Sequence, residues 1–193
     1  MGAYVNESGH RTVTQTLFGK DLKSGKAWSI FALRVVLGFM FLWGGIQKIG
    51  KEMAGSYATS GFLSHAVSGP FQVVFNGMAG NPAVEYLLVY GELLIGISLV
   101  FGIVSRVGSI AGIPMVLLMY VSQLPAGAAG YGNYLNQLLQ TDALFNEYIL
   151  MALIFLAFIF LVPGRFLGLD GVLQNSSFVQ RRPILSRIAL TLG

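Results

Sequence analysis

Four long apolar stretches, separated by segments rich in glycine, proline and charge, dominate the pattern of hydrophobic and polar positions along the chain. These stretches cover about residues 28–49, 83–104, 107–124 and 147–162. An α-helix needs roughly 20 residues to cross a hydrocarbon core about 30 Å thick. The pattern therefore predicts an all-α integral membrane protein, a four-transmembrane-helix bundle with interfacial segments in its two outer loops.

The two longer loops carry apolar residues of their own. The loop over residues 51–81 contains two short apolar runs, and the second, residues 71–75, is predicted to be re-entrant or interfacial because it is too short to span. The first run predicts a short helix on the membrane surface. Its apolar side chains share one helical face: Phe62, Leu63, Ala66 and Val67. The other loop, residues 127–142, is polar with aromatic residues.

Composition supports the membrane prediction and excludes several chemistries. Hydrophobic residues make up 54% of the chain and charged residues 10%, whereas soluble domains carry about 25% charged residues. The chain has no cysteine, which excludes disulfides, thiolate metal sites and iron–sulfur clusters, and we expect no metal site. Its two histidines, His10 and His65, both lie outside the predicted spans, so we expect no haem bound by this chain alone. A net charge of +4, scattered along the sequence, argues against a nucleic-acid partner.

The distribution of lysine and arginine predicts the orientation. Nine of the twelve lie in the two tails, at the turn between the second and third spans, and just after the fourth span, whereas the other two loops contain only Lys48 and Lys51. By the positive-inside rule, both termini face the cytoplasm. We therefore expect a multi-pass protein of the cell membrane, in contact with lipid. It comprises a cytoplasmic N-terminal tail (1–26), a membrane domain (27–173) and a cytoplasmic C-terminal tail (174–193).

Arg34 and Glu92 lie well inside predicted spans, where an uncompensated charge is costly. At about 1.5 Å per residue, Arg34 lies roughly 10 Å and Glu92 roughly 18 Å from the cytoplasmic ends of adjacent antiparallel spans. We predict a direct or water-bridged pair between Arg34 and Glu92. Alternatively, burial keeps Glu92 protonated and hydrogen-bonded to a neighbour. The sequence leaves open whether this group does chemistry or only sets helix register.

Three motifs in order resemble the DoxX superfamily: LWGGIQK at 42–48, YGELLIGISLVFGIVSR at 90–106 and PGRFLGLD at 163–170. The long first loop, through residues 60–70 and 78–81, resembles the DoxD branch more narrowly. That branch is the large membrane subunit of thiosulfate:quinone oxidoreductase in sulfur-oxidising archaea. The resemblance covers about residues 27–173.

The resemblance implies a respiratory-chain enzyme of sulfur metabolism that couples two thiosulfates into tetrathionate and passes the electrons to a membrane quinone. It also implies two kinds of partner, a DoxA-like small membrane subunit and the subunits of a terminal quinol oxidase. On this hypothesis we assign Glu92 and Arg34 as catalytic. Quinone reduction takes up protons, and Glu92, Glu147 and His65 are the candidate donors.

Four further residues are candidates for substrate binding: Gln47, Lys48, His65 and Arg106. The far end of the first span, where two glycines precede Gln47 and Lys48, is the predicted mouth of the site. Simpler roles stay open. Lys48 would then be an interfacial anchor, His65 a surface residue, and Arg106 a topology determinant. Asp170 most simply makes a turn after the last helix.

A second hypothesis treats the chain as a non-catalytic accessory subunit of a terminal quinol oxidase, so enzyme status is open. Small-residue sets would suit packing against larger partners. These sets are Gly91 with Gly96, and Gly108 with Gly112. A small carrier is less favoured, since four spans without paired broken helices do not match the transporter pattern.

Overall fold

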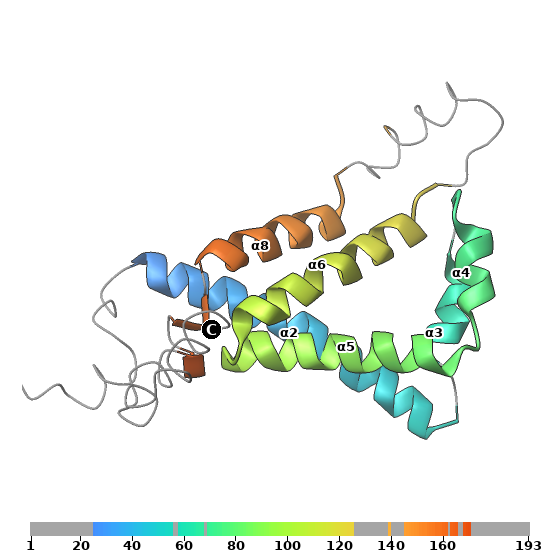
Figure 1. Ribbon diagram of the computed structural model, residues 1–193, viewed down its shortest axis with the longest axis horizontal. Helices are drawn as coiled ribbons and strands as arrows, with labels where there is room; N and C mark the ends of the chain where they lie inside the picture. Colours follow the sequence, from blue (N-terminus) through green and yellow to red (C-terminus); the bar gives the residue numbers. More distant parts are fainter. Residues whose placement is uncertain are drawn as a thin grey trace, which may run out of the picture.

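The computed structural model describes residues 25–55, 58–67, 69–125, 139, 145–161, 163–165 and 168–170, and all regular structure within these ranges is helical (Figure 1). The four longer helices are α2 (Gly25–Met53), α5 (Pro82–Phe101), α6 (Ser105–Ser122) and α8 (Glu147–Leu161). The short elements are α3 (Ala58–Gly61), the π-helix η1 (Phe62–Ala66), α4 (Gln72–Met78) and the 3-10 turn η2 (Pro163–Arg165). The prediction of an all-helical membrane protein is confirmed.

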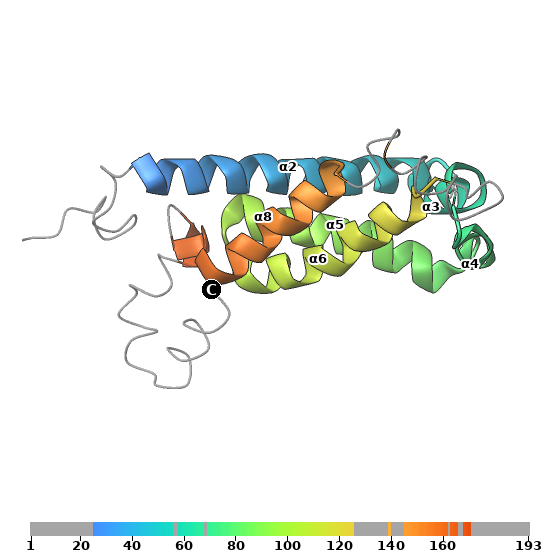
Figure 2. The same ribbon diagram turned by 90° about the horizontal axis from the view of Figure 1, so that it is seen from above.

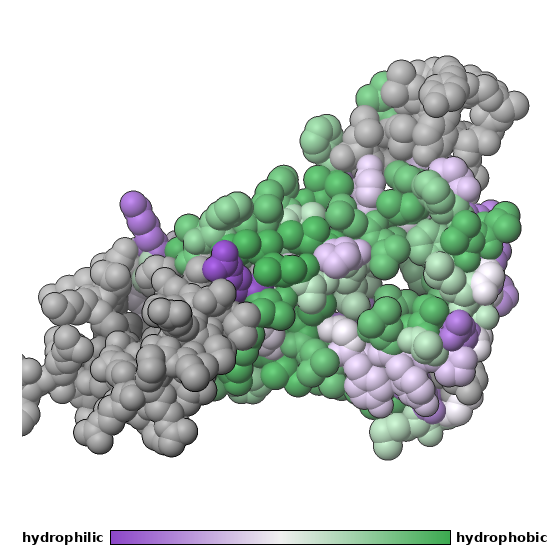
Figure 3. Space-filling model, in the orientation of Figure 1, coloured by the Kyte–Doolittle hydropathy of each residue, from purple (hydrophilic) through white to green (hydrophobic). Residues whose placement is uncertain are grey.

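Three helices, α2, α5 and α6, are long and apolar enough to cross a membrane. The fourth, α8, is apolar but only 15 residues long. Figure 3 shows apolar residues over the middle of the bundle and polar residues concentrated toward its ends. Helix α2 begins at Gly25, so the last two residues assigned to the N-terminal tail belong to the helix instead. The rest of that tail, the C-terminal tail, and the loop over 127–142 except Leu139 lie outside the described residues.

The helices pack in pairs, with α2 against α5, α6 against α8, and α5 against α6 between them (Figures 1 and 2). Buried apolar side chains from all four helices form one core: Leu37, Phe41, Ile95, Leu99, Met115, Val116, Phe155 and Phe158. Helix α5 begins where the Asn81 side chain accepts a 3.0 Å hydrogen bond from Ala83 N–H and Pro82 occupies the first turn. It ends at Gly102, whose φ of +63° is the left-handed conformation that glycine adopts readily.

Glycines set the register between α2 and α5. A Cβ added at Gly45 would lie 2.9 Å from the Leu93 backbone nitrogen, and one at Gly38 would lie 2.8 Å from that of Val100. On the facing side, a Cβ at Gly96 would overlap the Leu42 backbone. The two helices therefore approach at backbone distance, as small residues allow in membrane bundles.

The elements α3, η1 and α4 lie across one end of the bundle, which we call the α4 end (Figures 1 and 2). Leu63, Val67 and Phe75 are buried together there, packed against Val84 of α5 and Val121 of α6. Two of the four residues predicted to share an apolar face, Leu63 and Val67, are thus buried against the bundle. The opposite end, where α5 turns into α6 and η2 follows α8, is the η2 end.

Candidate functional site

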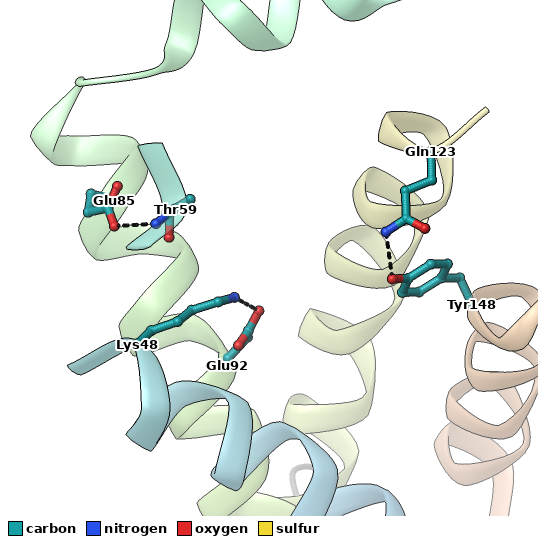
Figure 4. Close-up of polar contacts among 6 residues, drawn as sticks. All are labelled: Lys48, Thr59, Glu85, Glu92, Gln123 and Tyr148. Atoms are coloured by element: carbon teal, nitrogen blue, oxygen red, sulfur yellow. Dashed lines mark hydrogen bonds and ion pairs between the residues drawn. The ribbon is translucent and has the colours of Figure 1, made fainter. Parts of the chain in front are cut away.

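An ion pair between Lys48 of α2 and Glu92 of α5 lies toward the α4 end (Figure 4). Glu92 is almost completely buried, with 5% of its side chain exposed, whereas Lys48 is 26% exposed. Gly44 makes room for the carboxylate, since a Cβ at that position would come within 3.0 Å of Glu92 Oε2. The pair thus places one carboxylate and one ammonium group between two mainly apolar helices.

The predicted pair between Arg34 and Glu92 is wrong, because the helix register puts the two side chains far apart. Arg34 lies beside Gly102, where an added Cβ would contact its guanidinium. Gly102 follows Glu92 by ten residues, a separation of roughly 15 Å along a helix. The prediction assumed that the first span begins at the same height as the second span ends. In the structure, the N-terminal part of α2 extends well past the turn at Gly102 where α5 ends.

Arg34 belongs to a second polar cluster at the η2 end. Its side chain is fully buried, and Nη1 donates a 3.1 Å hydrogen bond to the Pro163 carbonyl oxygen. The guanidinium carbon also lies 5.3 Å from the centroid of the Phe31 ring, within the range of a cation–π contact. Asp170 supplies the opposite charge. Arg34 therefore joins the first helix to the segment that follows the last one.

Asp170 caps the N-terminus of α6. Its Oδ1 accepts a 2.7 Å hydrogen bond from Val104 N–H, and Oδ2 accepts one of 3.1 Å from Ser105 N–H. The Asp170 N–H donates in turn to the Gly102 carbonyl oxygen at 2.8 Å. A carboxylate at a helix N-terminus satisfies free backbone donors and complements the helix dipole. Beyond the turn expected of it, Asp170 thus connects the chain after α8 to the turn between α5 and α6.

A third polar contact joins α6 to α8 at the α4 end. Gln123 Nε2 donates a 2.8 Å hydrogen bond to the Tyr148 hydroxyl oxygen. Figure 4 shows this contact on the α6–α8 pair and the Lys48–Glu92 ion pair on the α2–α5 pair, and Glu92 contributes to the electrostatic environment of Tyr148. Sequence reasoning missed both residues. Their positions in the sequence could have indicated them as site residues, because each is a polar residue at the end of an apolar helix.

Glu85 is a second buried carboxylate on α5 that the sequence reasoning missed. It accepts hydrogen bonds from the backbone N–H groups of Thr59, at 2.8 Å, and Ser60, at 3.0 Å. The Ser60 hydroxyl donates to it as well, at 3.1 Å. Glu85 and Glu92 are seven residues apart, so they lie two turns apart on one helical face. That spacing could have indicated that Glu85 is buried, but not that it binds the backbone of the first loop.

The sequence profile of the DoxX family matches residues 29–125, which is half of the chain. The chain belongs to the DoxX family. This family is membrane-associated and includes subunits of quinone oxidoreductases. No curated protein and no solved structure matches the chain. The DoxX match contains Arg34, Lys48, Glu85 and Glu92, but it ends before Tyr148 and the Asp170 segment.

The remaining candidates of the DoxX chain are distributed over both ends of the bundle. Gln47 and His65 are exposed, and the Nδ1 atom of His65 lies 2.6 Å from the Ser64 hydroxyl. Among described residues, no hydrogen bond or ion pair links His65 to the Lys48–Glu92 pair. Arg106 lies in the first turn of α6, at the η2 end. Glu147 is exposed in the first turn of α8. The structure thus brings together Lys48 and Glu92 and places both arginines at the other end.

The glycine sets considered for packing against a partner are used within the DoxX chain itself. Gly96 faces Leu42, as described above, and a Cβ at Gly108 would overlap the Ser98 side chain. At Gly112 it would overlap the Phe155 ring of α8. The fourth glycine, Gly91, faces the methyl end of Met115. All four glycines therefore face other side chains or backbone of this chain, so they give no support to the accessory-subunit hypothesis.

Proposed function

We propose that this DoxX chain is the DoxD-like membrane subunit of a thiosulfate:quinone oxidoreductase. It oxidises thiosulfate to tetrathionate and reduces a membrane quinone, together with a DoxA-like small subunit and upstream of a terminal quinol oxidase. The observation that carries the proposal is the Lys48–Glu92 pair, an ionisable pair inside the membrane-spanning part of a family that includes quinone-oxidoreductase subunits. Ionisable residues at such depth are costly and commonly mark proton or substrate pathways.

The reaction assigns each member of the pair a task. Two thiosulfate ions form one sulfur–sulfur bond and release two electrons, and the quinone takes up those electrons with two protons to become a quinol. The Lys48 ammonium attracts the thiosulfate anion and balances the charge that develops on the quinone oxygens. Glu92 transfers protons to those oxygens, because its carboxylate can exchange a proton with its hydrogen-bonded partner.

Tyr148 and Gln123 add polar groups on the neighbouring α6–α8 pair. Gln123 donates to the Tyr148 oxygen, so the tyrosine hydroxyl hydrogen is directed away from Gln123 and can donate to a ligand. A quinone has two carbonyl oxygens that accept hydrogen bonds. On this proposal Lys48 with Glu92 engages one carbonyl and Tyr148 engages the other. Arg34, assigned as catalytic from the sequence, serves instead to hold the η2 end together.

We also propose that α8 is the fourth span and that both termini face the cytoplasm. Its 15 residues cover about 22 Å, which a bilayer accommodates by local thinning. Because the chain has no native cysteine, single cysteines can be labelled without background. A cysteine at Ser8 and one at Ser186 should react with an impermeant maleimide only after the cell membrane is opened, whereas one at Asn136 should react in intact cells. Labelling of Ser186→Cys in intact cells would contradict the four-span arrangement.

The activity is tested by thiosulfate-dependent reduction of a quinone analogue, using the purified chain alone and with its co-purifying membrane subunit. Glu92→Gln and Lys48→Gln should abolish turnover while the protein remains folded. Lys51→Gln is the matched control, an exposed lysine one turn further along α2, and should retain turnover. Wild-type inactivity in both preparations, with stable binding to haem-containing oxidase subunits, would reject the enzyme in favour of an accessory subunit.

A further inference from the structure

The α3–η1–α4 segment forms a unit that we call the end cap, residues 58–67 and 69–79. It runs across the end of the bundle rather than along it (Figures 1 and 2). Its own apolar side chains Leu63, Val67 and Phe75 cluster on the side that meets α5 and α6. The end cap is therefore a small packed layer over the ends of two membrane-crossing helices.

Chain continuity fixes the level of the end cap relative to a bilayer. Helix α4 ends at Met78, and the span α5 begins at Pro82. Four residues reach at most about 14 Å even when fully extended. Here the connection is compact, because Asn81 N–H donates to the Met78 carbonyl oxygen at 3.2 Å. The polar layer of a bilayer is roughly 5–8 Å thick on each side, so α4 cannot lie far from it.

Helix α4 is amphipathic outside its buried contact with the bundle. Val74 and Met78 are four residues apart and share one edge of the helix, and both are exposed, Val74 by 55%. Gln72 and Asn76, also four residues apart and exposed, share the opposite edge. Phe75 lies between these edges and is buried. An exposed apolar edge opposite a polar edge is the pattern of a helix lying in a membrane interface.

Glu85 holds the end cap in this orientation. Its buried carboxylate accepts the Thr59 and Ser60 N–H groups at the start of α3, so a charge on α5 is bonded to the backbone of the end cap. The Ser60 hydroxyl accepts a 2.9 Å hydrogen bond from Gly80 N–H, which ties the two limits of the segment together. Charge-assisted bonds of this kind are about twice as strong as neutral ones.

We propose that the end cap binds the lipid surface, with the Val74–Met78 edge of α4 in the acyl boundary and the Gln72–Asn76 edge toward water, and that Glu85 is its positioning residue. The partner is the bilayer rather than a protein, because α4 is held next to the start of a span and its exposed apolar edge lies at that depth. This inference does not depend on the thiosulfate activity. It would stand even if the chain proved to be an accessory subunit.

The test uses the full chain in liposomes with a single nitroxide-labelled cysteine and compares collisions with oxygen, which concentrates in lipid, and with a water-soluble nickel chelate. Val74→Cys should favour oxygen, and Asn76→Cys, two residues along the same helix, should favour the chelate. Val36→Cys on the exposed side of α2 is the reference for lipid. Equal preference for the chelate at both α4 positions would overturn the proposal. Protection of the Val74 label from both reagents would also overturn it and would indicate a protein contact instead.

The role of Glu85 is tested in the same labelled proteins. Glu85→Ala should remove the contrast between the Val74 and Asn76 labels while leaving the Val36 label unchanged. Glu85→Gln, which keeps one carbonyl acceptor, should restore part of the contrast. Full contrast in Glu85→Ala would refute the positioning role. Loss of the lipid signal at Val36 would identify a misfolded Glu85→Ala protein. The positioning role is then tested with Glu85→Gln, and a contrast between the Val74 and Asn76 labels equal to that of wild type would refute it.

Discussion

The Arg34–Asp170 cluster at the η2 end and the Lys48–Glu92 pair hold their buried charges in different ways. At the η2 end, Arg34 and Asp170 bond to backbone groups of Pro163, Val104 and Ser105, so their charges join separate parts of the chain. At the α4 end, Lys48 and Glu92 bond to each other through their side chains. Burial alone therefore does not identify a functional charge. A charge bonded to backbone turns stabilises the fold, whereas a charge held only by another side chain can exchange its partner for a ligand.

The largest effect on stability should come from Arg34→Met, which keeps an apolar side chain of similar length but removes the charge. Removing one partner from a buried charged cluster typically costs about 3–5 kcal/mol, because Asp170 loses a nearby opposite charge and the Pro163 carbonyl loses its donor. The free energy of unfolding, measured by titration from mild detergent into dodecyl sulfate, checks the loss. Lys26→Met, an exposed position on the same helix, is the control and should change little. An Arg34→Met protein with the same free energy of unfolding as wild type would contradict the structural role assigned to Arg34.

Adjacent glycines on α2 offer a finer test of the α4 end. Gly45→Ala should destabilise the protein by about 1–3 kcal/mol, since its Cβ meets the Leu93 backbone and forces α2 away from α5. Gly44→Ala meets only the Glu92 carboxylate, so it should lower turnover by displacing that group with a smaller cost in stability. The same unfolding titration, combined with the quinone-reduction assay, separates the two effects. Equal losses of stability would contradict the assigned register.

The smallest effect on stability should come from Tyr148→Phe. The change removes one side-chain hydrogen bond with Gln123, for which the expected cost is at most about 0.5–1.5 kcal/mol. Its effect on the reaction should be larger, seen as a raised KM for the quinone with the KM for thiosulfate unchanged. Thermal unfolding and steady-state kinetics check the two parts. An unchanged quinone KM would remove Tyr148 from the proposed site.

The sequence predicts the helices well and their contacts poorly. The long apolar stretches located α5 and α6 to within about three residues, because the length of an apolar span is a local property of the sequence. The pairing of Arg34 with Glu92 failed because helix register depends on which glycines meet which backbone. Gly38, Gly45 and Gly96 decide that register through contacts between helices, which a single sequence does not reveal.

The roles of Glu85 and Asp170 could not be predicted for a related reason. Both carboxylates bond to backbone N–H groups that are distant in sequence, at Thr59 and Ser60 in one case and at Val104 and Ser105 in the other. Backbone donors have no sequence signature of their own. By contrast, Lys48 and Glu92 were each singled out from the sequence as candidate site residues, and their partnership was missed.

The most direct test asks whether Glu92 takes part in the reaction while Asp170 only stabilises the fold. It compares Glu92→Gln with Asp170→Asn by measuring quinone reduction per mole of folded protein and the free energy of unfolding. Glu92→Gln should abolish turnover at a smaller cost in stability than Arg34→Met, because the amide keeps a polar partner for Lys48 and the lysine is partly exposed. Asp170→Asn should lose stability because it weakens the cap on α6, while its folded fraction keeps its turnover. The reverse pattern, with Glu92→Gln active and Asp170→Asn folded but inactive, would place the chemistry at the η2 end and contradict the assignment of Glu92 to the reaction.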